Sequence, residues 1–349
     1  MSRIRLSRSA SITPTDAGVI LRSDLGTFQL TGADVSAFLE RMAPLLDGSR
    51  DPEAIVEALA DYSRESVIAF LDLLKARGLV EPAPDAGEPP DRERLRGQIE
   101  FLRRWSTAPQ QAAQRLASAR VLVVGLDPWG AAAALALAEA GIAALRLIDG
   151  GAVGPDDAAV LRAHGRQAAL GAPRQGAVAA LIRERAPRCR VDESPAAALD
   201  AGDLLSPEGR PHLIVAAARG DDAELLARVA RFGHRAHVAS LFAHLAGTTA
   251  VLGPVVIPGK TACRVCAAAE ALNPPLTPRG SAIERGSPPH AGAMAQMLGH
   301  LAAMEALKVL SAYTPSRLAG RVLLQDLSTL ETSHHTLVRL PWCGVCGEG

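Results

Sequence analysis

The sequence has few aromatic residues: Phe, Trp and Tyr together make up 3% of its 349 residues. It also lacks an excess of charge of either sign, because 37 Lys and Arg residues balance 37 Asp and Glu residues. A chain without net charge has no global field that draws it to nucleic acid or to an anionic membrane. The composition therefore predicts neither of these as a partner.

Long hydrophobic runs are also absent. No stretch of about 18 uninterrupted apolar residues occurs, so no membrane-spanning helix is expected. The first eight residues, MSRIRLSR, are basic but are not followed by the apolar run of a signal peptide. Five cysteines do not make a disulfide framework in a chain of this length. We expect a soluble cytoplasmic protein, whose hydrophobic content of 48% is enough for a well-buried core.

Composition divides the chain into three regions: residues 1–85, a linker with a connecting helix over 86–118, and residues 119–349. The first region begins with short extended runs at 18–22 and 26–30. Three helical patterns and an extended exit at 79–82 follow, and this order is typical of a winged helix. Proline and charge mark the linker, and a single helix is expected from about Leu95 to Leu116.

The third region alternates between strand and helix patterns. Apolar strands are predicted at 120–124, 144–149, 190–192 and 212–216, with helices at about 174–186 and 221–233 between and after them. Such alternation predicts an α/β fold with a parallel sheet and helices on both faces. A last strand carries His334 and His335, to which no role is assigned.

Two C-x-x-C pairs are the strongest chemical signal. Cys263 and Cys266 form the first pair, and Cys343 and Cys346 form the second. Each pair directs two thiolates at one site, and two pairs complete a tetrahedral sulfur set for a structural zinc ion. Redox pairs or incidental thiols are the alternatives. Cys189 stands alone and is expected to be a small buried hydrophobe.

A glycine-containing turn follows the first strand of the third region. Gly125 and Gly130 are the first and last glycines of a G-x-G-x-x-G pattern, but Asp127 replaces the middle glycine and Pro128 follows it. Asp127 would repel phosphate, and Pro128 removes an N–H that could bind it. Asp149 ends the next strand, where an acid could bind ribose hydroxyls. The turn is thus either a degenerate nucleotide loop or a ligand-free connection.

These motifs together resemble the ThiF-type adenylating domain, whose members include ubiquitin-activating enzymes. The resemblance covers residues 119–349, including both cysteine pairs, a helix at 302–310 and a strand at 318–324. It implies phosphate-binding roles for Arg162, Arg166 and Arg174, the last in place of a family lysine. At the family's magnesium-binding Asp this sequence has Arg219, or Asp221 with a two-residue slip. Because an arginine opposes a metal ion, ATP-dependent adenylation is not expected, and the arginines are equally well explained as surface charges.

The first region resembles the PqqD-like domain that recognises leader peptides of ribosomally made natural products. The resemblance rests on Gly26-Thr-Phe-Gln-Leu-Thr-Gly, Leu46-Asp-Gly and the stretch Leu73–Val80. A leader would add as a strand beside 26–30, with the helix 63–77 as the opposite wall. The side chains expected to line this groove, or else to be core, are Phe28, Leu30, Val67, Phe70, Leu71 and Leu74.

The pair of domains resembles the Ocin-ThiF-like partner proteins of azole-forming, bacteriocin-type peptide clusters. The resemblance implies a non-catalytic adaptor that binds a precursor's leader and delivers it to a YcaO-type cyclodehydratase, which uses ATP to form azolines. ThiF relatives commonly dimerise, so the resemblance leaves open whether this protein forms a homodimer. The proline-rich segment 273–290 is either a docking loop or a tether. The alternatives are an active ATP-dependent adenylyltransferase acting on a peptide and a DNA-binding regulator, although the helix 63–77 lacks a basic face.

Overall fold

The computed structural model describes residues 3–7, 10–15, 17–23, 25–32, 34–83, 95–106, 108–163, 169–200, 204, 209–218, 222–269 and 292–347. The chain divides into two compact units, residues 1–92 and 93–349. Each unit has hydrophobic clusters of its own, so each is considered by itself.

The first unit contains two small antiparallel sheets. Strands β2 (Ser11–Thr15), β3 (Gly18–Ser23) and β4 (Gly26–Thr31) form one sheet in that order, and β1 (Ile4–Leu6) pairs with β5 (Val80–Pro82). Strands β2 and β4 are therefore the edges of the three-stranded sheet. Of the two, β2 contains Pro14, which protects an edge because it cannot donate a hydrogen bond.

Three helices cover this unit's core. Asp51 caps α2 (Pro52–Ala58) and Ser63 caps α3 (Arg64–Ala76), since each side chain accepts a hydrogen bond from a backbone N–H of the first turn. Helix α1 (Val35–Met42) continues into a short 3₁₀ turn, η1 (Ala43–Leu45). The predicted strands and helices of this region are all present, whereas its assignment as a PqqD-like winged helix stays a prediction.

The second unit is built on one eight-stranded sheet with the order β13-β12-β11-β10-β9-β6-β7-β8. Its parallel part consists of β6 (Arg120–Val124), β7 (Ala144–Ile148), β8 (Arg190–Ser194), β9 (Leu213–Ala216) and β10 (Ala239–Ala246). The chain runs outward from β6 to β8, then returns to the other side of β6 for β9. The carboxyl ends of β6 and β9 meet at this reversal, where ligands bind in open α/β sheets.

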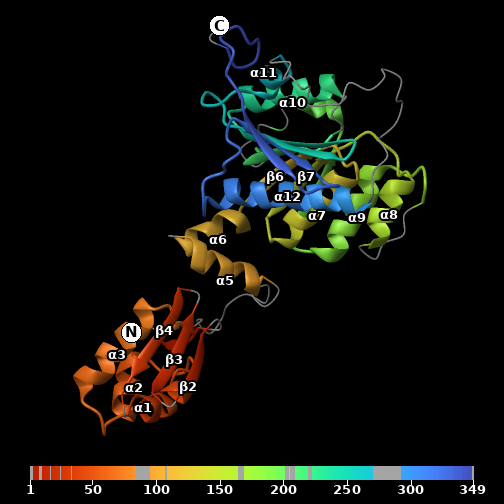
Figure 1. Ribbon diagram of the computed structural model, residues 1–349. Helices are drawn as coiled ribbons and strands as arrows, with labels where there is room; N and C mark the ends of the chain where they lie inside the picture. The colour runs from red at the N-terminus through yellow and green to blue at the C-terminus, as the bar shows by residue number, and fades with distance from the viewer. Residues whose placement is uncertain are drawn as a thin grey trace. The chain divides into compact units, whose positions relative to one another are not determined.

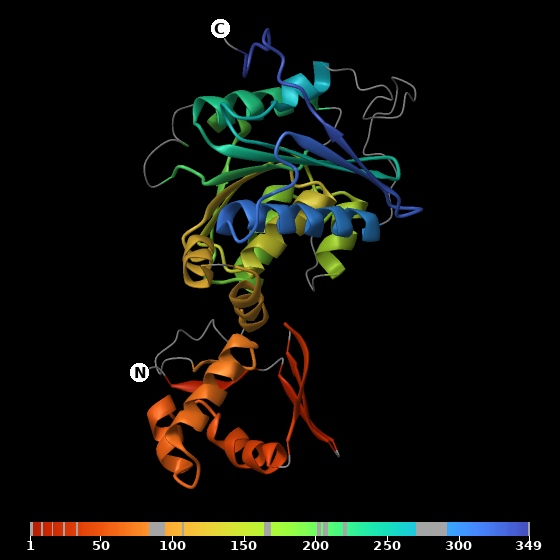
Figure 2. The same ribbon diagram turned by 60° about the vertical axis from the view of Figure 1, so that its left-hand side comes forward.

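Helices cover both faces of this sheet (Figures 1 and 2). On one face lie α7 (Pro128–Glu139), α8 (Pro155–Ala163), α9 (Arg174–Arg185) and α12 (Gly292–Ser311). The other face carries α10 (Ala223–Arg235) and α11 (Arg264–Ala269), and the 3₁₀ turn η2 (Ala196–Leu199) packs in the same cluster. One hydrophobic cluster lies under each set of helices, which confirms the α/β prediction.

Two sequence expectations need correction. The sheet is parallel only in part, because β11 (Thr249–Val256), β12 (Arg321–Asp326) and β13 (Thr332–Thr336) run antiparallel to their neighbours. The single helix expected from Leu95 to Leu116 is two helices, α5 (Arg96–Trp105) and α6 (Pro109–Ala117). Proline cannot continue a preceding helix but suits the first turn of a new one, which explains the break at Pro109.

In the described part of the chain, no helix has both the length and the apolar character needed to cross a membrane. The predicted domain boundaries at residues 85 and 118 stay predictions.

Candidate metal centre and nucleotide loop

Four cysteines come together although 76 residues separate the two pairs. All four Sγ atoms lie within 4.8 Å of one another. The Sγ of Cys263 lies 3.8 Å from that of Cys266 and 3.6 Å from that of Cys343, and the Sγ atoms of Cys266 and Cys346 are 3.3 Å apart. In a tetrahedral site with Zn–S bonds of about 2.3 Å, sulfur atoms are about 3.8 Å apart. The thiol set therefore fits a metal ion of this kind.

The two pairs come from different parts of the fold. Cys263 and Cys266 lie at the start of α11, while Cys343 and Cys346 follow β13 near the end of the chain. Hydrogen bonds from Cys343 N–H to Leu340 and from Gly347 N–H to Cys343 shape the second pair into a tight turn. A bound ion would thus tie the C-terminal tail to the α10–α11 face of the sheet.

The thiols differ in their ease of ionisation. Burial raises the pKa of Cys263. Burial also opposes ionisation of Cys343, but the backbone N–H groups of Cys346 and Val345 outweigh it and lower the pKa of Cys343 to about 7. Metal binding requires thiolates, so an incoming cation must displace protons from the more buried thiols. With four protein ligands and no open position, the centre is suited to a structural role.

The loop after β6 stands at the reversal point of the sheet. Gly125 has φ of +86°, and a Cβ at this position would lie 2.5 Å from the backbone of Ala218. A Cβ on Gly130 would lie 2.3 Å from the carbonyl oxygen of Gly125. Both glycines are therefore needed for close backbone packing. This requirement explains their presence without any ligand.

Asp149 is held by backbone groups at this loop. One carboxylate oxygen accepts a hydrogen bond of 2.7 Å from the N–H of Leu126, and the other accepts one of 2.7 Å from the N–H of Gly151. The second oxygen also accepts from Nε of Arg174 at 3.1 Å. Asp149 thus joins the ends of β6 and β7, and both its oxygens are engaged.

Arg174 connects three carboxylates at the first turn of α9. Besides Asp149, its guanidinium contacts Asp127 at 3.0 Å and Asp157 at 3.3 Å. The Arg174 side chain is 14% exposed, and its three partners are 4–9% exposed. Burial lowers the pKa of Arg174, but the three carboxylates more than offset this and raise it, so the guanidinium stays charged. The cluster of one cation and three anions carries a formal net charge of −2.

The sequence of this chain matches the model of a known protein family. The model of the ThiF family matches residues 100–345. The chain belongs to the ThiF family. Among curated proteins, HesA of Leptolyngbya boryana is 29% identical over 266 residues, which cover 72% of this chain and 86% of that protein.

Solved structures with ThiF-like folds align over nearly the whole chain. E. coli MccB crystallised with ATP has a TM-score of 0.69 at 17% identity and covers 99% of both chains. The microcin C7 biosynthetic enzyme MccB in complex with N-formylated MccA gives 0.70 at 18% identity, again over 99% of both. PaaA gives 0.69 at 17% identity, over 96% of this chain and 100% of its own. These similarities establish the fold.

Paired charges lie at the loop after β6 in this ThiF family member. Asp127, at the position of the middle glycine of the G-x-G-x-x-G pattern, forms a buried ion pair with Arg174. Among the described residues at this loop, the buried cation Arg174 is already surrounded by carboxylates. Sequence reasoning identified Asp127 as a repulsive group but missed Asp157, which accepts from the N–H of Gly154 at the start of α8 and carried no recognisable motif.

The other nucleotide-site predictions divide into two groups. Gly125, Gly130, Asp149 and Arg174 lie together at the loop. Arg162 lies on the last turn of α8 and is exposed. Arg166, both candidate positions for the family's metal-binding acid (Arg219 and Asp221) and the segment 273–290 lie outside the described residues.

The residues expected to bind a peptide also divide into two groups. Phe28, Leu30 and Phe70 are partly exposed. Phe28 lies under the guanidinium of Arg77, 4.4 Å from ring centre to Cζ. In contrast, Val67, Leu71 and Leu74 are at most 1% exposed and pack in the core of the first unit, which is the alternative given for them. Their role in peptide binding stays a prediction. A unit this small needs its large apolar side chains for its own core.

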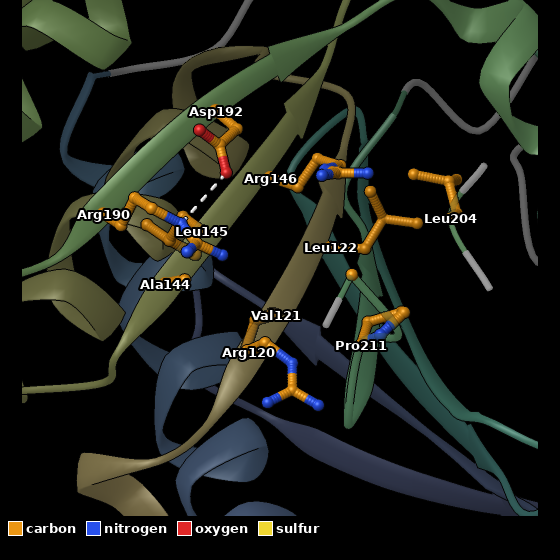
Figure 3. A pocket seen from close by; sticks show the side chains of 11 residues that line it. Arg120, Val121, Leu122, Ala144, Leu145, Arg146, Arg190, Asp192, Leu204 and Pro211 are labelled. Carbon is orange, nitrogen blue, oxygen red and sulfur yellow. Dashed lines mark ion pairs between the residues drawn. The ribbon is translucent and has the colours of Figure 1, made fainter. Parts of the chain in front are cut away.

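A small pocket at the opposite end of the parallel strands contains several arginines (Figure 3). Arg146 stands between Leu122 and Asp192 in the sheet register, and Asp192 pairs with Arg190 at 3.2 Å. The guanidinium groups of Arg120, Arg146 and Arg190 point in different directions. They therefore do not form a common anion site.

Proposed function

We propose that this protein is a leader-peptide-binding adaptor: its N-terminal unit captures the leader of a ribosomally made precursor, and the protein delivers it to a separate YcaO-type cyclodehydratase. In this proposal the ThiF-like unit is a scaffold held by a structural zinc ion at Cys263, Cys266, Cys343 and Cys346. It performs no adenylation. The adaptor raises the effective concentration of the precursor at the enzyme.

The observation that carries the proposal is the cluster of ion pairs around Arg174 at the loop after β6. An adenylating enzyme must bring the ATP phosphates next to a free cation. Here Arg174 is surrounded by Asp127, Asp149 and Asp157, and Pro128 removes a loop N–H. The sheet and the cluster of four cysteines are both present, which is the pattern expected of a scaffold whose chemistry is supplied by a partner.

The edge strand β4 supports the leader-binding half of the proposal. Its residues are uncharged, and it contains no proline, whereas the opposite edge β2 contains Pro14. Because β3 and β4 are joined by a two-residue loop, alternation places the N–H and C=O groups of Thr27, Gln29 and Thr31 at the free edge. Phe28 and Leu30 offer partly exposed apolar surface on one face of the strand. This combination suits strand addition by an extended peptide.

The test uses the full-length, zinc-loaded protein and a fluorescent precursor peptide encoded beside its gene. We expect binding that Gln29→Pro weakens at least about tenfold, because proline removes an edge N–H and hinders pairing. Gln29→Ala keeps the N–H and is the matched control. Equal binding by Gln29→Pro and wild type would overturn the edge assignment.

Adenylation is tested separately by ATP–pyrophosphate exchange with the same protein and peptide. We expect no exchange above the protein-free background. The alternative function, an ATP-dependent adenylyltransferase acting on a peptide, is favoured by the fold it shares with MccB, whose crystals contain ATP. Exchange that depends on the peptide and is lost on substitution of Asp149 would establish that alternative and refute the adaptor.

A further inference from the structure

Arg339 connects the segments that carry the two cysteine pairs. It lies in the sequence between β13 and the second pair. Its Nε donates a hydrogen bond of 2.7 Å to the carbonyl oxygen of Cys346, and its Nη1 donates one of 3.4 Å to the carbonyl oxygen of Gly259. A guanidinium can bind two acceptors at once because its N–H groups are fixed in a planar fork. Arg339 therefore joins the second pair to the turn before Cys263 without being a metal ligand itself.

The carbonyl of Gly259 belongs to an ordered turn that leads into the first pair. The N–H groups of Lys260 and Thr261 both donate to the carbonyl oxygen of Ile257. The N–H of Ile257 in turn donates to the hydroxyl of Thr261 at 2.9 Å. Gly259 has φ of +76°, a conformation that glycine adopts without steric cost. Arg339 thus contacts an acceptor whose position is set by its own turn.

The carbonyl of Cys346 lies in the turn of the second pair. The N–H of Gly347 donates to the carbonyl of Cys343 at 2.8 Å, and a Cβ on Gly347 would lie 2.6 Å from that same oxygen. Glycine therefore keeps this turn closed. Apolar packing of the partly buried Leu340 and Val345 holds the turn near the sheet. Packing of this kind has no direction, so a directed contact outside the turn is needed to set how the second pair faces the first.

An assembled site binds an ion more tightly than one that must be assembled during binding. The two pairs lie far apart in the sequence, and ordering a free tail would reduce the affinity for the ion. The hydrogen bonds of Arg339 order the tail when the protein folds, so this cost is not part of metal binding. Contacts outside the ligand set commonly change metal affinity by about 10–100-fold.

We propose that Arg339 is a positioning residue of the four-cysteine site: its guanidinium holds the second pair against the first, so that the site is assembled before a metal ion binds. The bridge acts through its geometry, because two acceptors must be reached at once. The inference rests on the proposed metal ion at the four cysteines and does not depend on leader binding.

The first test is the affinity of the full-length, reduced, metal-free protein for Co²⁺, which occupies tetrahedral thiolate sites and is followed by its visible absorption. Arg339→Gln is too short to reach both carbonyls and should weaken binding by about 10–100-fold. Arg339→Lys keeps the charge but lacks the planar fork, so it should weaken binding to a similar degree. Arg115→Gln is the control and should bind like wild type, because it loses an arginine-to-carbonyl bond, to Ser311, away from the cysteines.

The outcomes of this titration separate the bridge from the ion. Equal affinity of Arg339→Gln and wild type, or full recovery of affinity by Arg339→Lys, would overturn the bridge while leaving the metal ion in place. Wild type that binds no Co²⁺ would refute the metal ion itself, and with it the role of Arg339.

The second test asks whether the site is assembled before the ion binds. In the metal-free wild type, residues 337–347 should exchange their amide hydrogens more slowly than an unfolded chain does. Metal-free Arg339→Gln should exchange faster there, and saturation with Zn²⁺ should remove the difference, because the ion then holds the pair in place. A difference that persisted with Zn²⁺ bound would indicate a general structural role and contradict the proposal. Exchange of the wild-type segment at the unfolded rate would overturn it even if the variant failed to fold.

Discussion

Arg174 determines what the loop after β6 can bind. A buried guanidinium with three carboxylates is neutralised before any phosphate arrives, and an incoming anion must compete with ion pairs of 3.0–3.3 Å. The cluster also joins the β6 loop, the end of β7, α8 and the start of α9. Arg174, which by resemblance to the adenylating enzymes would bind nucleotide phosphates, thus connects the elements at this end of the sheet.

Replacing Arg174 tests its structural role. Arg174→Gln keeps a polar but shorter side chain and leaves three buried carboxylates without a cation, so it should lower the free energy of unfolding by about 3–5 kcal/mol. Urea unfolding followed by circular dichroism measures the change. Arg183→Gln breaks an exposed ion pair with Glu193 and should cost less than about 1 kcal/mol. Equal effects of the two substitutions would contradict a structural cluster.

The sequence predicted part of this arrangement. The positive charge at 174, the acid at 149 and the repulsive Asp127 are all visible in the motif. What could not be read is that they contact one another, because Asp127 lies 47 residues and Asp157 lies 17 residues before Arg174. A phosphate-binding arginine and an internally paired one have the same sequence signature. Only the fold, by bringing three loops together, distinguishes them.

Close contact between α7 and α12 depends on small side chains. Helix α7 is rich in alanine, and a Cβ on Gly299 of α12 would lie 2.5 Å from the carbonyl oxygen of Trp129 and 2.6 Å from Cβ of Ala132. Backbone atoms cannot move aside as a flexible side chain could. The glycine therefore sets the distance between the helices.

Two helical glycines should respond oppositely to the same substitution. Gly299→Ala forces α12 away from α7 and should destabilise the protein by about 1–3 kcal/mol. Gly97→Ala, in α5, meets no atom within 4 Å and should stabilise by up to about 1 kcal/mol, because alanine is the better helix former. Thermal unfolding of both variants gives the comparison. If Gly299→Ala proved as stable as Gly97→Ala, the close packing would be refuted.

At the scale of elements, the periodicity of apolar residues predicted the positions of individual helices and strands. It did not predict the direction of a strand relative to its neighbours in the sheet. Apolar spacing and capping residues predicted β3–β5 and α1–α3 of the first unit and the parallel strands β6–β9, but not β1, β2 or the parallel strand β10. The antiparallel strands β11 and β12 carry apolar runs of the same kind as parallel strands, so their direction is invisible locally. The break between α5 and α6 could have been predicted from Pro109, since proline favours the start of a helix over its interior.

The whole molecule consists of two units with separate cores, and among the described residues the cluster of four cysteines belongs to the second unit. The cluster of Ile4 to Val80 contains no residue of the second unit. Cys263, Cys266 and Cys346, in contrast, belong to the cluster on the α10–α11 face of the large sheet. Loss of the metal should therefore weaken one unit and leave the other intact.

Metal removal should act on residues 93–349 alone. An ion bound by the four thiolates would tie α11 to the C-terminal tail, so chelation should cost that unit about 3 kcal/mol or more, equivalent to a fall in Tm of about 6–12 °C. Hydrogen exchange read by mass spectrometry should show faster exchange in β10, β11 and α11, with unchanged exchange in α1–α3.

Cys343→Ser should reproduce the effect of chelation. Cys189→Ser is the control: it alters a buried thiol that is not one of the four, and it should not increase the release of zinc. Because an ion with four thiolate ligands would have no open position for a substrate, its loss should appear as faster exchange even with no substrate present. Unchanged exchange throughout after complete metal removal would show that the four thiols do not stabilise the fold.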